Sequence, residues 1–208
     1  HTVRHSFPTR RSSDLVPIIV DRKERREMVT ALAFDLVAEI GIEALTFKQI
    51  ADTAGYSTAI ISNYFHNKNE LLFKVYEVAN IRARDRLVAA FEAGLPLLDC
   101  FETILPISLE SQKNWRVWLS FWGRVHLDSL YAAERSRAAR DSLVLYRKML
   151  AFRHGDANGD CGFDLDMASH RLLALIAGTA LEACFDPDNW SPERMRAVIA
   201  SELDSLSA

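Results

Sequence analysis

Two groups of residues in this chain have types and spacings that could do chemistry, and the first is polar. It lies around Ile61 and Phe65, which are four residues apart and therefore share the inward face of a helix. The outward positions are small or polar: Ser57, Thr58, Ala59, Ser62, Asn63 and Tyr64. Hydroxyl and amide groups can bond to base edges in a DNA major groove, and a tyrosine can bond to a phosphate. This surface therefore favours DNA reading.

The second group is an aromatic stripe. Trp115, Trp118 and Trp122 follow the spacing i, i+3, i+7, which places them along one side of a helix. Together with Tyr146 from another helix, such rings could form a cage for a quaternary ammonium group, held by cation–π attraction. An aromatic stripe at helical spacing is more often packed in a core. The sequence leaves both interpretations open.

The polar surface needs a helix, a tight turn and a second helix to present it. Thr46 and Gln49 form a capping-box pattern that starts a helix, and Gly55 ends this helix in a left-handed turn. Ser57 then caps the second helix, which reaches about Phe65. This is a helix-turn-helix arrangement. Thr46, Lys48 and Lys68 lie beside the second helix and extend the predicted DNA-binding set.

The stretch from Gly41 to Leu72 resembles the DNA-binding domain of the TetR family of bacterial repressors. Within the family, the run from Ser57 to Phe65 is most similar to the choline-responsive repressors of glycine betaine synthesis (BetI type). The resemblance rests on Gly41, Leu45, Thr46, Ile50, Ala51, Ala54, Gly55, Ser57, Ile61, Tyr64, Phe65, Lys68, Leu71 and Leu72. It implies an all-α fold and a phosphate contact by Lys68.

The resemblance further implies a ligand-released repressor that binds a palindromic double-stranded DNA operator as a homodimer. The last two helices, expected at 163–185 and 191–206, would form the dimer interface. A choline-like or amphipathic inducer would bind in the second domain, and no cofactor is implied. One departure concerns the pocket, because similar repressors carry a tryptophan after the glycine equivalent to Gly178, whereas this chain has Thr179 and Ala180.

The chain divides into three parts on this interpretation. Residues 1–20 form a leader, of which 1–15 resemble a translated cloning artefact; residues 21–72 bind DNA, and 73–208 form a helical ligand-binding and dimerisation domain. An apolar stripe predicts a helix over 21–40 that Gly41 ends. Further helices are expected over 98–111, bent at Pro106, and over 113–130 and 131–152. The arginines at the start of the first helix fit either phosphate contact or a solvated surface.

Composition narrows the function classes. The 208 residues carry a net charge of −3, so placement of basic residues rather than total charge supports DNA binding. Three scattered cysteines and the lack of a signal-peptide pattern or long apolar run predict a cytoplasmic protein. Residues 156–160 imitate a calcium loop but lack its glycine and its final glutamate. The sequence contains no recognisable catalytic motif. The alternative to a DNA-binding regulator is a cytosolic small-molecule-binding protein or enzyme with a vestigial helix-turn-helix.

Overall fold

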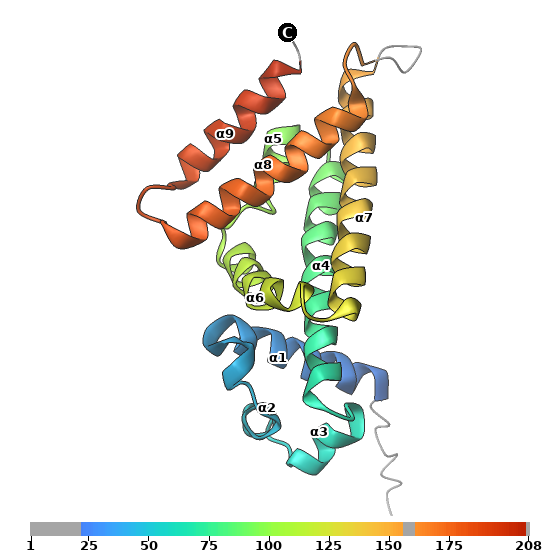
Figure 1. The fold of residues 1–208 in the computed structure, drawn as a ribbon, viewed down its shortest axis with the longest axis vertical. Helices are drawn as coiled ribbons and strands as arrows, with labels where there is room; N and C mark the ends of the chain where they lie inside the picture. Colours follow the sequence, from blue (N-terminus) through green and yellow to red (C-terminus); the bar gives the residue numbers. More distant parts are fainter. Residues whose placement is uncertain (1–21, 156–160, 207–208) are drawn as a thin grey trace, which may run out of the picture.

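A computed structural model describes residues 22–155 and 161–206, and all regular structure in these ranges is helical (Figure 1). None of the described helices is both long and apolar enough to span a membrane. The helices are α1 Arg22–Ala44, α2 Phe47–Ala54, α3 Thr58–Tyr64, α4 Lys68–Glu92, α5 Leu97–Glu102, α6 Leu109–Val125, α7 Ser129–His154, α8 Leu165–Phe185 and α9 Pro192–Ser205. The predicted all-α fold is confirmed. The leader and the calcium-like loop lie outside the described residues.

The predicted caps of the helix-turn-helix are confirmed. The backbone nitrogen of Gln49 donates to the Thr46 hydroxyl at 3.2 Å, and the Gln49 side chain accepts from the Thr46 backbone at 2.8 Å. Gly55 has a φ of 68°, a backbone conformation that is unfavourable for residues with a Cβ atom. The Ser57 side chain accepts from the backbone nitrogen of Ile60 and starts α3. These contacts fix the angle between α2 and α3.

One predicted helix end is confirmed and two others are wrong. Gly41 ends the regular first helix with a φ of 77°, and a short helical segment then continues α1 to Ala44. The expected helix over 98–111 is instead α5, a series of turns around Pro106, and the start of α6, because proline lacks the amide hydrogen that a continuous helix requires. The helices expected at 113–130 and 131–152 meet earlier, because Asp128 caps α7 and releases residues 126–128 into a turn.

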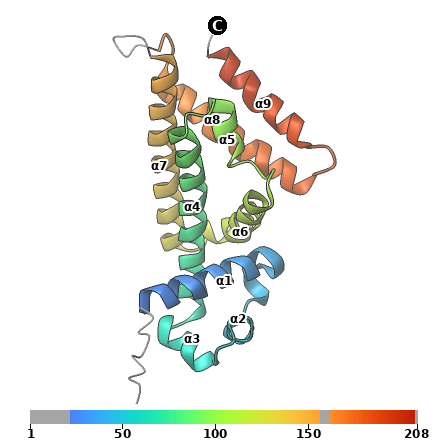
Figure 2. The same ribbon diagram turned by 180° about the vertical axis from the view of Figure 1, so that it is seen from behind.

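Two hydrophobic cores share helix α4. The lower core packs α1, α2 and α3 against the first half of α4, up to Ala79, and the upper core begins at Ala83 and includes α5, α7, α8 and α9. Figures 1 and 2 show α4 running from the small lower unit into the upper bundle beside α7. The division into 21–72 and 73–208 stays a prediction. A continuous α4 means that the two units are mechanically joined.

Helix α6 lies across α1 and forms the second connection between the units. Its residues Val117 and Phe121 are fully buried in the lower core. Two ion pairs border this contact: Lys113 Nζ lies 2.9 Å from Asp35, and Arg124 lies 3.0 Å from Glu43. The paired side chains are between 29% and 85% exposed, so solvent screens both pairs and each contributes about 0–1 kcal/mol, and the apolar packing dominates the contact.

Candidate nucleic-acid interface and ligand cavity

The predicted DNA-reading surface forms the lower end of the molecule, where α2 and α3 lie (Figure 1). Its side chains are mostly exposed: Thr46, Lys48, Ser57, Thr58, Ala59, Ser62 and Asn63. Inside α3, Ile61 and the following Phe65 are fully buried, as their spacing predicts. The Ser62 hydroxyl donates to the Thr58 carbonyl at 3.1 Å and can still accept a hydrogen bond from a ligand. The surface is therefore compact, polar and accessible.

The arginines at the start of α1 bind the recognition helix α3 and its neighbour. Arg22 donates to the backbone carbonyl of Asn63 at 3.0 Å, and a hydrogen bond with the Tyr64 side chain raises the pKa of Arg25. Arg26 pairs with Glu70 at 2.6 Å and stacks over the Phe65 ring, 4.7 Å from its centroid. These contacts hold α3 in place, and a phosphate contact by the donors that remain exposed stays a prediction.

Glu70 completes this arrangement at the start of α4. Its carboxylate accepts from the backbone nitrogen of His66 at 2.8 Å as well as from Arg26, and its own backbone nitrogen donates to Asn67. The His66 hydrogen bond, followed by that from Arg26, lowers the pKa of Glu70. The link between α3 and α4 is thus fixed by a charged side chain rather than by apolar packing alone.

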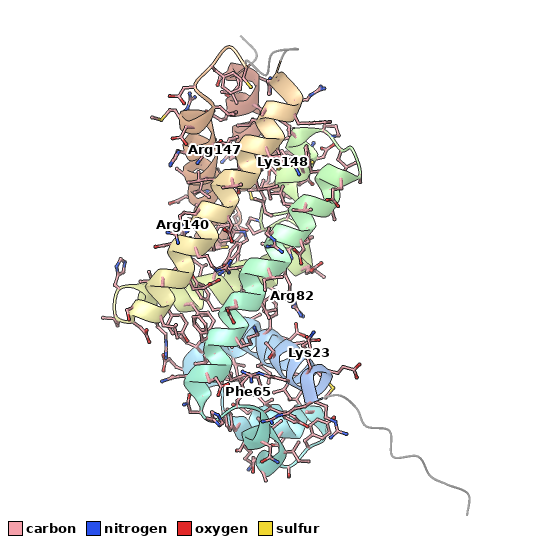
Figure 3. The ribbon with its side chains drawn as sticks, turned by 90° about the vertical axis from the view of Figure 1, so that its right-hand side faces the viewer. Lys23, Phe65, Arg82, Arg140, Arg147 and Lys148 are labelled. Atoms are coloured by element: carbon pink, nitrogen blue, oxygen red, sulfur yellow. The ribbon has the colours of Figure 1, made fainter. Side chains whose placement is uncertain are left out.

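The two lysines of the predicted DNA-binding set differ in their surroundings. Lys48 is exposed on α2, whereas Lys68 is partly buried and donates to the Glu43 carbonyl at 3.1 Å. Three arginines of α4 also differ in their surroundings, and only Arg84 among them is largely exposed. Arg82 stacks over Phe34, 4.3 Å from the ring centroid (Figure 3), and Arg86, with its side chain 18% exposed, donates to the Thr103 carbonyl at 3.2 Å.

A cavity of about 110 Å³ lies between α4, α6, α7 and α8 in the upper unit. This volume exceeds the roughly 10–15 Å³ that one water molecule requires. All four aromatic residues of the predicted ligand set line it: Trp115, Trp118, Trp122 and Tyr146. Two further aromatic residues of α6 and α7, Phe121 and Tyr131, stack on each other in the lower core and do not line the cavity. Thr179 and Ala180 are buried but do not line the cavity.

The three tryptophans meet edge to face. The Trp115 ring lies 4.9 Å from Trp118 and 5.8 Å from Trp122, at interplanar angles of 86° and 76°. The Trp115 indole donates to the Ile104 carbonyl at 2.7 Å, and the Trp118 indole donates to Asn80 at 2.9 Å. The two interpretations of the stripe are therefore compatible, because the same rings belong to the upper core and line the cavity.

A polar wall on the α7 side of the cavity was not predicted. Asn80 donates to the carboxylate of Glu134 at 2.8 Å, and Arg137 donates to both Glu134 oxygens and to Asp141. Burial alone would raise the pKa of Glu134, but the hydrogen bonds from Arg137 and Asn80 outweigh it and lower the pKa. The readable signal was the spacing of Glu134, Arg137 and Asp141, which places them on one side of a helix.

Comparison with known proteins agrees with this architecture. Residues 29–75 match the model of bacterial regulatory proteins of the tetR family, and residues 95–208 match the C-terminal domain of BetI-type transcriptional repressors. The regulator BetI from Klebsiella pneumoniae is 31% identical over 170 residues, 76% of this chain and 81% of BetI. The regulator PksA from Bacillus subtilis is 25% identical over 199 residues, 92% of this chain and 94% of PksA.

Solved structures share the fold. A transcriptional regulator from Saccharomonospora viridis, crystallised in complex with choline, has a TM-score of 0.71 at 24% identity and covers 88% of this chain and 96% of its own. A TetR regulator from Haloarcula marismortui has a TM-score of 0.74 at 19% identity, over 88% and 98% of the two chains. The family models and the BetI relatives show that this chain belongs to the TetR family of bacterial transcriptional regulators, with a C-terminal domain of the BetI repressor type.

Proposed function

We propose that the protein is a cytoplasmic, dimeric, ligand-released repressor that reads its operator with α3 and takes a quaternary ammonium compound into the tryptophan-lined cavity. The observation that carries this proposal is the position of α6. Trp118 and Trp122 on this helix line the cavity, whereas Val117 and Phe121 pack in the core of the DNA-reading unit. A ligand that shifts α6 therefore also shifts α1, and a ligand that prefers one arrangement changes the population of DNA-competent dimers.

Operator contacts follow from the exposed surface of α2 and α3. Thr58 and Asn63 carry hydrogen-bonding groups suited to base edges, and Ser57, Ser62 and Tyr64 lie beside them. Thr46, Lys48 and Lys68 flank the helix and serve phosphates in this proposal, with Ala59 fitting closely against the groove. A dimer would place two copies of α3 about one DNA turn, roughly 34 Å, apart on a palindrome.

The DNA-reading part is tested by gel shift with operator and unrelated DNA. Asn63→Ala should weaken operator binding by about 1–3 kcal/mol and leave unrelated DNA unaffected, because it loses a base contact. Lys48→Ala should weaken binding to both DNAs and reduce the salt dependence by about one unit, because it loses a phosphate contact. Unchanged operator affinity in Asn63→Ala would contradict the assigned orientation of α3.

The ligand part of the proposal rests on the chemistry of the cavity. Three indole rings and the Tyr146 ring line the cavity, and the faces of such rings attract a quaternary ammonium group. This attraction does not require hydrogen bonds, which a quaternary ammonium cannot donate through its nitrogen. The C-terminal domain of this chain is of the BetI type, and a regulator with the same fold was crystallised in complex with choline. The absence of a tryptophan at Thr179 leaves the cage to α6 and α7.

Tryptophan fluorescence tests the ligand part. Choline should quench wild-type fluorescence and release the protein from operator DNA. Trp118→Phe should weaken choline binding about threefold or more, because phenylalanine attracts cations less strongly than tryptophan. Trp190→Phe is the matched control, since the fourth tryptophan lies between α8 and α9 and does not line the cavity. Equal choline affinity in both variants would place the ligand elsewhere.

The proposed dimer interface consists of α8 and α9. On α8, the exposed positions include the small residues Ala174 and Gly178 and the apolar Phe185, which is 70% exposed. Small residues permit close approach of a second helix, and an exposed aromatic ring at this end needs a covering surface. Helix α9 lies along α8 in both views, so the pair can form a four-helix bundle with its copy (Figures 1 and 2).

A further inference from the structure

One arginine in the cavity lining has no ion-pair partner in the part of the chain that the structure describes. Four charged residues line it: Arg84, Arg135, Arg137 and Asp141. Arg84 pairs with Asp85 at 3.0 Å, and Arg137 pairs with Asp141 and Glu134, both at 2.7 Å. Arg135 has no ion-pair partner among the described residues, although it is partly buried. One guanidinium at this wall therefore lacks a counter-charge.

A second donor in the lining of this cavity also lacks an acceptor among the described residues. The Tyr76 side chain lines the same cavity and is 0% exposed, and its hydroxyl has no hydrogen-bond partner among the described residues. Burial raises the pKa of Tyr76 to about 12, so its hydroxyl keeps its proton at neutral pH. The phenol is thus a neutral donor that lines the same cavity as the Arg135 guanidinium.

These two donors define the kind of group that the cavity accepts. Leaving a buried hydroxyl unpaired costs free energy, and enclosing an unpaired guanidinium costs more. A ligand that is only cationic would leave both costs in place and add a second positive charge near Arg135. A carboxylate would satisfy the guanidinium and the phenol together through charge-assisted hydrogen bonds.

We infer that the natural ligand is a small zwitterion, whose carboxylate is bound by Arg135 and Tyr76 while its quaternary ammonium packs against Trp118 and Trp122. The cationic half rests on the function proposed above, whereas the carboxylate half rests on Arg135 and Tyr76 alone. Asp141 and Glu134 are already bound by Arg137, so the wall keeps its internal ion pairs when the ligand enters.

Four ligands of nearly the same shape separate the two halves in calorimetric titrations of the full chain. Choline carries the cation only, glycine betaine carries the cation and a carboxylate, and 3,3-dimethylbutanol and 3,3-dimethylbutanoate are their uncharged-carbon counterparts. Glycine betaine should bind about tenfold to a hundredfold more tightly than choline, the ratio expected for one charge-assisted hydrogen-bonded pair.

Arg135→Gln should abolish this preference and leave choline binding equal or tighter, because it removes both the partner of the carboxylate and the repulsion of the cation. Arg140→Gln is the matched control: Arg140 is an exposed arginine on the same helix, away from the cavity lining (Figure 3). Tyr76→Phe should reduce the preference severalfold without weakening choline binding. Opposite effects on two ligands cannot arise from a general loss of folding.

The inference is wrong if glycine betaine binds wild type no more tightly than choline, or if its advantage survives Arg135→Gln or disappears equally in Arg140→Gln. The carbon counterparts report on the function proposed above. If 3,3-dimethylbutanoate binds as tightly as glycine betaine, the tryptophan cage does not recognise a cation, yet the carboxylate site stands. If choline and glycine betaine bind equally and both bind more tightly than their counterparts, the cage stands and the carboxylate site is refuted.

Discussion

Tyr131 carries a buried hydroxyl group without a hydrogen-bond partner among the described residues. Its ring stacks on Phe121, with centroids 5.5 Å apart, and meets the Tyr76 ring at 5.7 Å. The ring therefore contributes to the lower core, whereas the hydroxyl loses its hydrogen bonds to water. At such a position the ring and the oxygen have opposite effects on the free energy of unfolding.

We predict that Tyr131→Phe increases the free energy of unfolding by about 1 kcal/mol at neutral pH, because it removes an unsatisfied buried hydroxyl and keeps the ring. Burial raises the pKa of Tyr131 to about 12 from an ordinary value near 10. The stabilisation associated with the neutral phenol is complete below pH 10 and is lost as the pH rises toward 12. Near pH 11 the variant should therefore gain about a further 1 kcal/mol over wild type.

Urea unfolding at pH 7 and pH 11 measures both effects. Tyr56→Phe serves as a control, because Tyr56 is only partly buried and its hydroxyl is absent from the unsatisfied buried groups. A Tyr131→Phe variant that is less stable than wild type at pH 7 would show that the hydroxyl is bonded in solution.

The residues of the ligand cavity were only partly predictable. The tryptophan stripe is visible because its three members follow one helical period within a single helix. Tyr76 and Asn80 lie one turn apart on α4, whereas Arg135 belongs to α7, and no spacing in the chain relates the two helices; only the packing of α4 against α7 brings these residues together. The intramolecular role of Arg26 was equally hidden, because its partner Glu70 lies 44 residues later.

At the scale of elements, local side-chain chemistry determines helix ends wherever a cap is present. Thr46, Ser57, Asn67 and Ser191 start helices at the positions that their types predict, since each side chain accepts from a backbone nitrogen of the first turn. The region around Pro106 was predicted wrongly because apolar residues recur through it at helical intervals, and the periodicity does not register the missing amide hydrogen. Ser108, which caps α6, was the overlooked signal.

The turn between α2 and α3 offers a test of this view with two matched substitutions. We predict that Gly55→Ala destabilises the protein by about 1–2 kcal/mol, because Gly55 has a φ of 68° that a Cβ disfavours. Gly123→Ala should instead stabilise it by about 0.5–1 kcal/mol, because Gly123 lies in regular helix α6. A Cβ at either position meets no atom within 4 Å, so backbone conformation alone distinguishes them.

Thermal unfolding of the two variants side by side measures the difference, and gel shift with operator DNA follows its consequence. Gly55→Ala should also weaken operator binding, because the angle between α2 and α3 depends on the turn, whereas Gly123→Ala should not. If both substitutions change stability in the same direction, the left-handed turn is not a determinant of the fold.

At the scale of the whole molecule, the two units of the described chain expose different kinds of surface. The lower unit exposes a polar surface, and the upper unit encloses its cavity on several sides, but α8 keeps a strip of small and apolar side chains exposed beside α9. Arg171 on α8 pairs with Glu202 on α9 at 2.8 Å, so these two helices are held together within one chain. The pair can therefore pack as a unit against the same two helices of a second chain, forming a symmetric four-helix bundle.

We predict that Ala174→Arg converts the protein to a monomer and abolishes operator binding while the lower unit stays folded. Ala174 is exposed on α8, and a second copy of this helix would bury the new charge without a partner, at a cost of several kcal/mol. Ala177 is less suitable for this test, because it lines the cavity.

The matched control is Ala133→Arg, at an exposed small residue on α7, which should remain dimeric. Analytical ultracentrifugation gives the mass, gel shift gives operator binding, and circular dichroism verifies folding. A stable Ala174→Arg dimer would place the twofold axis on other helices, and the α3 spacing on DNA would then have to be derived anew.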